Sequence, residues 1–160
     1  MHIAVISMVR NEADIIESFV RHAASFADRI YIVNHNSTDE TRKILDELVQ
    51  EGLPLKVENF YGAAQAQSEV MTELMRRAFG ELYDFVLPLD ADEFLLSDGE
   101  YDMNWCREAL FTACTPDKIY QLPWVTYQTA NEYAGKKFVW QKNAIAKYSR
   151  NPWENYYWGG

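Results

Sequence analysis

Strand-like and helix-like segments alternate along the first part of this chain, and that alternation limits the possible folds more than any other feature. Short runs rich in β-branched and aromatic residues predict strands over residues 2–9, 29–34, 55–60 and 83–89. Apolar residues at helical spacing predict helices in the intervening segments, residues 10–28, 35–52 and 63–79. This alternation predicts an α/β fold, with a mostly parallel sheet covered by helices on both faces.

The second part of the chain has a different pattern. The sequence predicts a turn at residues 96–102, a further helix at 103–113, and two strands at 118–129 and 138–149. We expect these two strands to form a short mixed or antiparallel extension at the C-terminal end of the sheet. A length of 160 residues is that of one ordinary domain, and no repeat, low-complexity tract or linker divides the sequence. We therefore expect a single domain over residues 1–160.

The composition argues against several kinds of partner and location. Acidic residues outnumber basic ones by 24 to 15, and no lysine and arginine cluster could follow a phosphate backbone, so we expect no nucleic-acid partner. No apolar run approaches the roughly 20 residues that span a bilayer, and the N-terminus lacks a basic region and a cleavage site. Cys106 and Cys114 lie about 12 Å apart along one predicted helix, too far for a disulfide. We expect a cytoplasmic protein without its own membrane segment; peripheral attachment to a membrane stays open.

Acidic residues directly follow the fourth predicted strand. The stretch "LPLDADEFLL", residues 87–96, ends an apolar run with Asp90, Asp92 and Glu93. Carboxylates at the end of a buried strand repel one another and lose hydration unless a partner compensates them. They form either a solvated turn or a cation site. Strand spacing places Asp90 and Asp92 on one side, away from Glu93, so this pair could bind Mn²⁺ or Mg²⁺, with diphosphate oxygens and water as further ligands.

Polar side chains that could bind a ligand also follow the first three predicted strands. They are Asn11 and Glu12, then Asn34, Asn36 and Asp39, then Gln65 and Gln67. Helix capping is an alternative explanation for two of these segments, with Asn11 as an N-cap three residues before Asp14, and Ser37 with Glu40 as a capping box. Because the carboxyl ends of parallel strands meet at one edge of a sheet, where open α/β sheets bind ligands, we expect these polar clusters to converge.

Three of these segments resemble, in order, the motifs of family 2 glycosyltransferases with the GT-A fold. They read "MVRNEADIIESFVRHA" at residues 8–23, "NHNSTDET" at residues 34–41 and "LDADEFL" at residues 89–95. The resemblance implies an enzyme that moves a sugar from a nucleoside diphosphate sugar, usually uridine-linked, to a hydroxyl of a carbohydrate or glycoconjugate acceptor. It also implies a divalent metal, Mn²⁺ or Mg²⁺, that grips the diphosphate.

The resemblance also implies roles for individual residues. Asp92 would be the principal metal ligand, and Asp90 would contact the metal through its water, or contact the ribose. Glu12 and Asp39 would bind the nucleoside. The full set of residues expected to contact the nucleotide is Val9, Asn11, Glu12, Asn34, Asn36, Asp39, Gln65, Gln67, Asp90 and Ala91.

The sequence departs from the family pattern at two points. Asn34 stands where the family usually has an aspartate, and no histidine follows His35, although members often have a metal-binding histidine and a base carboxylate well after the acidic motif. Glu132 and Glu154 are the candidate bases. Residues 1–160 are then either a fragment without the C-terminal acceptor part or a minimal version of the enzyme. A non-catalytic nucleotide-sugar-binding domain and a nucleotidyltransferase are the alternative functions.

Overall fold

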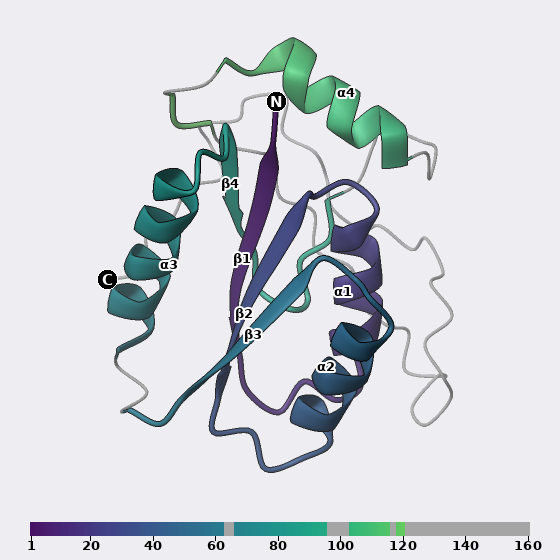
Figure 1. The fold of residues 1–160 in the computed structure, drawn as a ribbon, viewed down its shortest axis with the longest axis vertical. Coiled ribbons are helices and arrows are strands. Elements are labelled where there is room, and N and C mark those ends of the chain that lie inside the picture. Colours follow the sequence, from purple (N-terminus) through teal and green to yellow (C-terminus); the bar gives the residue numbers. More distant parts are fainter. Residues whose placement is uncertain (63–65, 96–102, 116–117, 121–160) are drawn as a thin grey trace, which may run out of the picture. The chain divides into compact units, whose positions relative to one another are not determined.

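The computed structural model describes residues 1–62, 66–95, 103–115 and 118–120, nearly all of them in one compact unit, Met1–Lys118. Strands and helices alternate along this unit, as the sequence predicts (Figure 1). In chain order the elements are β1 (Ile3–Val9), α1 (Ile16–Ala24), β2 (Arg29–His35), α2 (Thr41–Gln50), β3 (Leu55–Phe60), α3 (Gln67–Gly80), β4 (Phe85–Pro88) and α4 (Met103–Ala113). The predicted C-terminal strands lie almost entirely outside the described residues, and a single domain over residues 1–160 stays a prediction.

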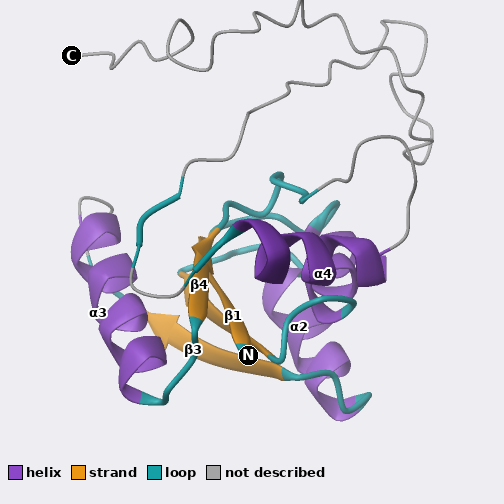
Figure 2. Ribbon diagram, turned by 90° about the horizontal axis from the view of Figure 1, so that it is seen from above, coloured by secondary structure: helices purple, strands orange, loops and turns teal. Residues whose placement is uncertain are grey.

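The four described strands form one parallel sheet in the order β3-β2-β1-β4. The register places Val9 of β1 beside Asn34 of β2, and Asn34 beside Asn59 of β3. Helices α1 and α2 cover one face of the sheet, and α3 covers the other. Figure 2 shows the same layers from above. The predicted α/β fold, with a parallel sheet between helices, is therefore confirmed.

Alternate residues of β1 face the two helical layers, because successive side chains of a strand point to opposite faces. Ile3 and Val5 belong to the apolar cluster formed with α1 and α2, whereas Ala4 and Ile6 belong to the cluster formed with α3. All seven residues of β1 are buried, which explains its almost uninterrupted apolar run. Burial on both faces gives the loop after β1 a rigid support.

Two helices begin later than the capping patterns predict. Helix α1 begins at Ile16, and Asn11 instead has a left-handed backbone with a φ of 57°. Helix α2 begins at Thr41, and neither N-cap residue bonds through its side chain. The interpretations of Asn11 as an N-cap and of Ser37 with Glu40 as a capping box are therefore wrong. The reason is that the polar groups of these loops bond to each other.

Helix α4 is attached through Arg107. The guanidinium donates hydrogen bonds to the Asp28 carboxylate and to the carbonyl oxygens of Phe26 and Met1. Cys114, directly after the helix, is buried and has a free thiol. Across the described residues, no helix is long and apolar enough to cross a membrane. The cytoplasmic location stays a prediction.

Leu82, in the turn between α3 and β4, has a backbone conformation that leucine rarely adopts. Its φ is 67° and its side chain is 83% exposed. We expect Leu82→Asn to raise the free energy of unfolding by about 1 kcal/mol, because asparagine tolerates the left-handed region better. Urea denaturation measures the change. The control is Val49→Asn, since Val49 is also exposed but lies in a right-handed helix; an equal gain at both positions would contradict relief of backbone strain.

Candidate functional site

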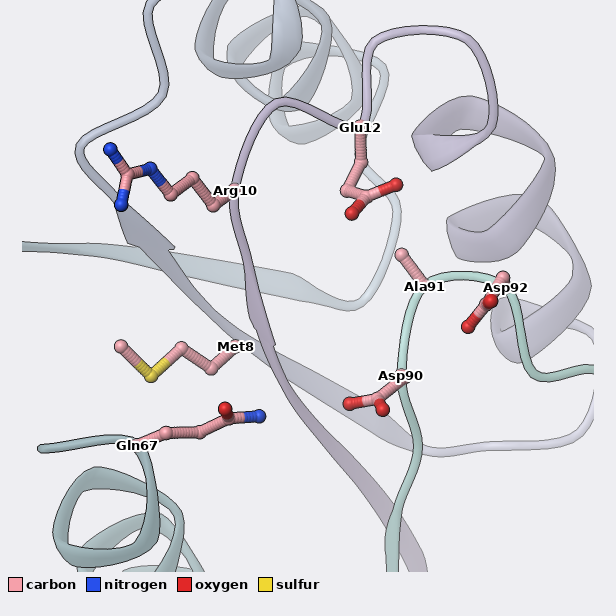
Figure 3. Close-up of a pocket in the computed structure, with 7 residues that line it drawn as sticks. All are labelled: Met8, Arg10, Glu12, Gln67, Asp90, Ala91 and Asp92. Atoms are coloured by element: carbon pink, nitrogen blue, oxygen red, sulfur yellow. The ribbon is translucent and has the colours of Figure 1, made fainter. Parts of the chain in front are cut away.

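A cavity of about 340 Å³ opens at the carboxyl edge of the sheet, where the loops of parallel strands meet. Its walls come from the end of β1 and the following loop, from the start of α3, and from the turn after β4 (Figure 3). The residues that line it are Met8, Arg10, Glu12, Gln67, Asp90, Ala91 and Asp92. We call this cavity the acidic pocket, because three of these side chains are carboxylates.

The structure brings together half of the predicted site residues that it describes. Those that line the acidic pocket are Glu12, Gln67, Asp90, Ala91 and Asp92. Those that are described but do not line it are Val9, Asn11, Asn34, Asn36 and Asp39. Those outside the described residues are Gln65, Glu132 and Glu154. The sequence interpretation missed Met8 and Arg10, which also line the pocket. Strand alternation could have indicated them, because the two neighbours of the buried Val9 point to the opposite face from Val9.

The acidic turn, residues 89–95, begins directly beyond β4. The predicted strand spacing of Asp90 and Asp92 is therefore wrong, because both residues lie beyond the extended strand. The Leu89 N–H donates to the Ile6 carbonyl at 3.1 Å and so anchors the beginning of the turn to β1. Both aspartates nevertheless line the acidic pocket, and Figure 3 shows their carboxylates pointing from the turn into it.

Glu93 closes the acidic turn. Its carboxylate accepts a hydrogen bond from the Asp90 N–H at 2.9 Å, and its own N–H donates to the Asp90 carbonyl at 3.0 Å. Burial raises the pKa of the Glu93 carboxyl; the hydrogen bond with Asp90 opposes this effect, and the charges on Asp90 and Asp92 add to it. Glu93 therefore shapes the turn, while the two aspartates face the pocket.

Negative charge is concentrated around the acidic pocket. Burial raises the pKa of the Glu12 carboxyl, and the charges on Asp14, Asp92, Asp39 and Asp90 raise it further. The part of this increase in pKa that comes from the four aspartates means that neighbouring carboxylates repel one another. A cation in the pocket would therefore relieve an unfavourable interaction.

The donor atoms of the pocket fit a divalent cation that also binds a substrate. Carboxylate oxygens suit Mg²⁺ and Mn²⁺, and Mg²⁺ at phosphate sites usually takes one or two protein carboxylates, with phosphate and water completing its shell. In the part of the chain that the structure describes, no group of three or more His, Cys, Asp or Glu side chains converges to hold a metal. Asp90 and Asp92 supply two carboxylates, a number that such an ion takes from a protein at a phosphate site.

The loops after β1 and β2 are joined by hydrogen bonds, which we call the interloop network. The Asn11 N–H donates to the Ser37 hydroxyl at 3.0 Å, and the Thr38 N–H donates to the Asn11 side-chain oxygen at 2.7 Å. Asparagine tolerates a left-handed backbone because its short side chain can bond locally. Asn11 thus turns the chain at the end of β1 and joins it to the next loop.

Thr41 and Asp39 complete the interloop network and hold Glu12. The fully buried Thr41 hydroxyl accepts from the Glu12 N–H at 2.8 Å and donates to Asp39 at 2.6 Å. Asp39 also accepts from the N–H groups of Thr41 at 3.0 Å and Ala13 at 3.1 Å. Partial desolvation opposes ionisation of Asp39, but these hydrogen bonds outweigh it and hold its pKa below the usual range. Asp39 thus supports the Glu12 loop, and its contact with a nucleoside stays a prediction.

Asn34 lies near the carboxyl end of β2 and does not line the acidic pocket. Its side-chain N–H donates to the Asn59 side-chain oxygen at 3.1 Å, and Arg42 donates to the same oxygen at 2.9 Å. The Asn34 side-chain oxygen is buried and has no hydrogen-bond partner among the described residues. A buried acceptor without a donor is unfavourable, so this oxygen suits an N–H group of a ligand.

His22 of α1 contacts the end of the acidic turn. Its Nε2 donates to the Leu95 carbonyl at 2.9 Å, and its ring lies edge-on to Phe26 and Phe94. Burial lowers the pKa of His22, although the hydrogen bond to Leu95 acts in the opposite direction. The folded protein therefore favours the neutral imidazole.

This environment predicts that folding stability falls in mild acid. The unfolded chain binds a proton at His22 near pH 6.5, while the folded chain resists protonation until a lower pH. The contribution of the neutral imidazole to the free energy of unfolding is therefore complete above about pH 6.5, and it is lost as the pH falls toward the pKa of His22 in the folded protein. Between about pH 7.5 and about pH 5.5, urea denaturation should show a smaller decrease in the free energy of unfolding for His22→Gln than for the wild type. Equal decreases would contradict the stabilising role of the neutral His22 imidazole.

Comparison with known proteins gives one match that covers almost the whole chain. The model of the family described as Glycosyl transferase family 2 matches residues 4–156. No curated protein matches the chain. The matched range includes nearly all of the parallel sheet and every residue that lines the acidic pocket. The chain therefore belongs to glycosyl transferase family 2, and its parallel α/β sheet is the Rossmann-like arrangement expected of the GT-A fold.

Proposed function

We propose that this protein transfers a sugar from a nucleoside diphosphate sugar, with uridine as the nucleoside, to a hydroxyl of a carbohydrate or glycoconjugate acceptor. The observation that carries this proposal is the meeting of Asp90, Asp92 and Glu12 in one pocket of a family 2 chain. The pocket lies at the carboxyl edge of the sheet, where open α/β sheets bind ligands. Family membership supports the class of reaction, and the acidic pocket supports its location.

Asp92 is the proposed principal metal ligand, and Asp90 is proposed to contact the metal, its bound water or the ribose. Mn²⁺ or Mg²⁺ held there with the diphosphate would supply Lewis acidity for the charge on the leaving phosphate. The role of the chain is to fix the two carboxylates before the donor arrives. Leu89 anchors the turn to β1, and Glu93 closes it around Asp90.

Glu12 and Asn34 are the proposed acceptors for the nucleoside. Glu12 lines the acidic pocket, and the Thr41 hydroxyl fixes its backbone. The buried Asn34 oxygen that has no partner among the described residues suits the N–H of a uracil ring. The other proposed nucleotide contacts are Val9, Asn11, Asn36, Asp39, Gln65, Gln67 and Ala91.

The acceptor hydroxyl must lose a proton during transfer. If the configuration of the sugar inverts, a carboxylate within hydrogen-bond reach should take that proton. Glu132 and Glu154 are the proposed candidates, and both lie outside the described residues. Residues 1–160 are proposed to form one nucleotide-sugar-binding domain, either of a minimal enzyme or of a longer one that also has an acceptor part.

Incubation of the 160-residue chain with Mn²⁺ and a panel of nucleotide sugars tests the proposed function. We expect one uridine-linked sugar to release UDP, with water taking the glycosyl group in place of the acceptor hydroxyl, and we expect EDTA to stop the release. UDP binding without release from any donor would contradict the transferase and favour a non-catalytic nucleotide-sugar-binding domain. Turnover that continues at full rate in EDTA would contradict the role of the metal.

A further inference from the structure

Helix α1 contacts both the loop that carries Glu12 and the end of the acidic turn. At its start, the Ile16 N–H donates to the Glu12 carbonyl at 2.8 Å. Further along the helix, Phe19 and His22 contact the segment that follows Asp92. One rigid element therefore connects the loop that carries Glu12 with the end of the acidic turn.

The contact at the end of the acidic turn combines aromatic packing with a hydrogen bond. The Phe94 ring lies edge-on to Phe19, with centroids 6.3 Å apart, and to His22, with centroids 5.1 Å apart. Phe26 packs against the same imidazole at 5.7 Å. His22 Nε2 lies 2.9 Å from the Leu95 carbonyl oxygen, which can only accept, so Nε2 carries the hydrogen. A polar side chain with apolar neighbours thus bonds the backbone of the turn.

Hydrogen bonds to the described residues fix the acidic turn at three places. The first joins its beginning to β1, the second closes it between Asp90 and Glu93, and the third joins its end to His22. Asp92 is exposed and lies between the beginning of the turn and the His22 contact. Loss of the third hydrogen bond would remove one of the contacts that join the C-terminal side of Asp92 to helix α1.

We propose that His22 is a positioning residue: by holding the Leu95 carbonyl, it sets the place of Asp90 and Asp92 in the acidic pocket. His22 does not line the pocket, so it acts through the backbone of the turn. The binding of a metal by the two carboxylates rests on the proposed function. The positioning of the acidic turn by His22 does not depend on it. A leucine would retain the apolar contacts but would leave the Leu95 carbonyl without this donor.

Two substitutions separate the hydrogen bond from the packing. His22→Leu keeps an apolar side chain and removes the donor, while His22→Gln presents an amide N–H in place of the Nε2 donor. Leu48→Ala is the stability control, because Leu48 is buried near the end of α2, at the opposite edge of the sheet from the pocket. All three variants are made in the full chain.

Hydrogen exchange of the backbone amides of residues 90–95 gives a readout that requires no ligand. We expect these amides to exchange about tenfold faster in His22→Leu, because the end of the turn opens more often. His22→Gln should restore most of the protection, and Leu48→Ala should not accelerate exchange selectively in this segment. Unchanged exchange in His22→Leu would overturn the proposal.

Titration with Mn²⁺ in the presence of UDP gives the second readout. We expect His22→Leu to weaken Mn²⁺ binding by about 10–100-fold, the usual effect of losing a residue that orients metal ligands. His22→Gln should recover most of the affinity, and Leu48→Ala should retain it. An equal loss in Leu48→Ala would overturn the proposal, because stability alone would then explain the effect. If the wild type binds no Mn²⁺, the proposed function fails, and hydrogen exchange still decides whether His22 holds the turn.

Discussion

Replacing Asp92 with asparagine is expected to weaken Mn²⁺-dependent binding of UDP by about 100-fold or more, while the fold remains intact. The substitution keeps the size of the side chain and removes one negative charge from the acidic pocket. A bound metal stabilises phosphate charge by several kcal/mol, and each 1.4 kcal/mol, roughly, changes an affinity tenfold. Calorimetric titration of UDP in the presence of Mn²⁺ measures the loss.

The same variant has a distinct expected result without metal. Besides burial, the charge on Asp92 raises the pKa of both Glu12 and Glu93, so a neutral residue there relieves repulsion. The free energy of unfolding of Asp92→Asn should therefore be unchanged or higher. Glu47→Gln, which neutralises an exposed carboxylate on α2, is the matched control and should bind UDP as the wild type does. Full UDP affinity in Asp92→Asn would contradict the proposed metal site.

Replacing Thr41 with valine is expected to lower the free energy of unfolding by about 1–3 kcal/mol, the usual cost of leaving buried polar groups unsatisfied. Valine has nearly the same shape as threonine, but the Glu12 N–H and the Asp39 carboxylate each lose a hydrogen-bond partner. Thr41 is fully buried, so water cannot easily replace the hydroxyl. Urea denaturation measures the loss, and UDP affinity should fall with it because the loop that carries Glu12 is loosened.

Thr41→Ser is the control for the interloop network. Serine keeps the hydroxyl that joins Glu12 to Asp39 and loses one buried methyl group, so its destabilisation should be smaller and its UDP affinity closer to that of the wild type. If serine destabilises the protein as much as valine does, packing rather than hydrogen bonding explains the importance of Thr41.

Hydrophobic periodicity was sufficient to predict most of the fold. The predicted strand at residues 55–60 and the predicted helix at residues 103–113 coincide with β3 and α4. Both predictions depend on the local repeat of apolar residues, which burial imposes on strands and helices alike. The alternation of elements then predicts a parallel sheet, because the intervening helices cross from one strand to the next.

The starts of α1 and α2 were wrongly predicted, because capping residues can bond to distant partners as well as to their own helix. Asn11, Ser37 and Asp39 all belong to the types that cap helices. In the structure, Asn11 bonds to Ser37 across 26 positions of the sequence, and Asp39 bonds to Ala13 across the same separation. No local pattern distinguishes these two uses of a polar side chain.

The sequence was sufficient to predict that Asp90 and Asp92 lie close together, but not how the turn that carries them is built. The sequence predicted that Asp90 and Asp92 face the same space, but it placed them on a strand, whereas they lie on a turn that Glu93 closes. His22 gave no sign of its contact with Leu95, which lies 73 positions away in the sequence. Contacts of this kind depend on the packing of α1 against the finished sheet, which periodicity does not specify.

Titration of UDP into the wild-type chain, first with Mn²⁺ and then with EDTA in its place, tests most directly whether the acidic pocket is a metal-dependent nucleotide site. We predict that UDP binds in the presence of Mn²⁺ and that its affinity falls by about 100-fold or more in EDTA. The reason is that diphosphate oxygens complete the coordination shell of the metal, and the metal in turn stabilises the charge of the diphosphate. Equal affinity for UDP under both conditions would contradict the site, since Asp90 and Asp92 would then hold no metal that grips the diphosphate.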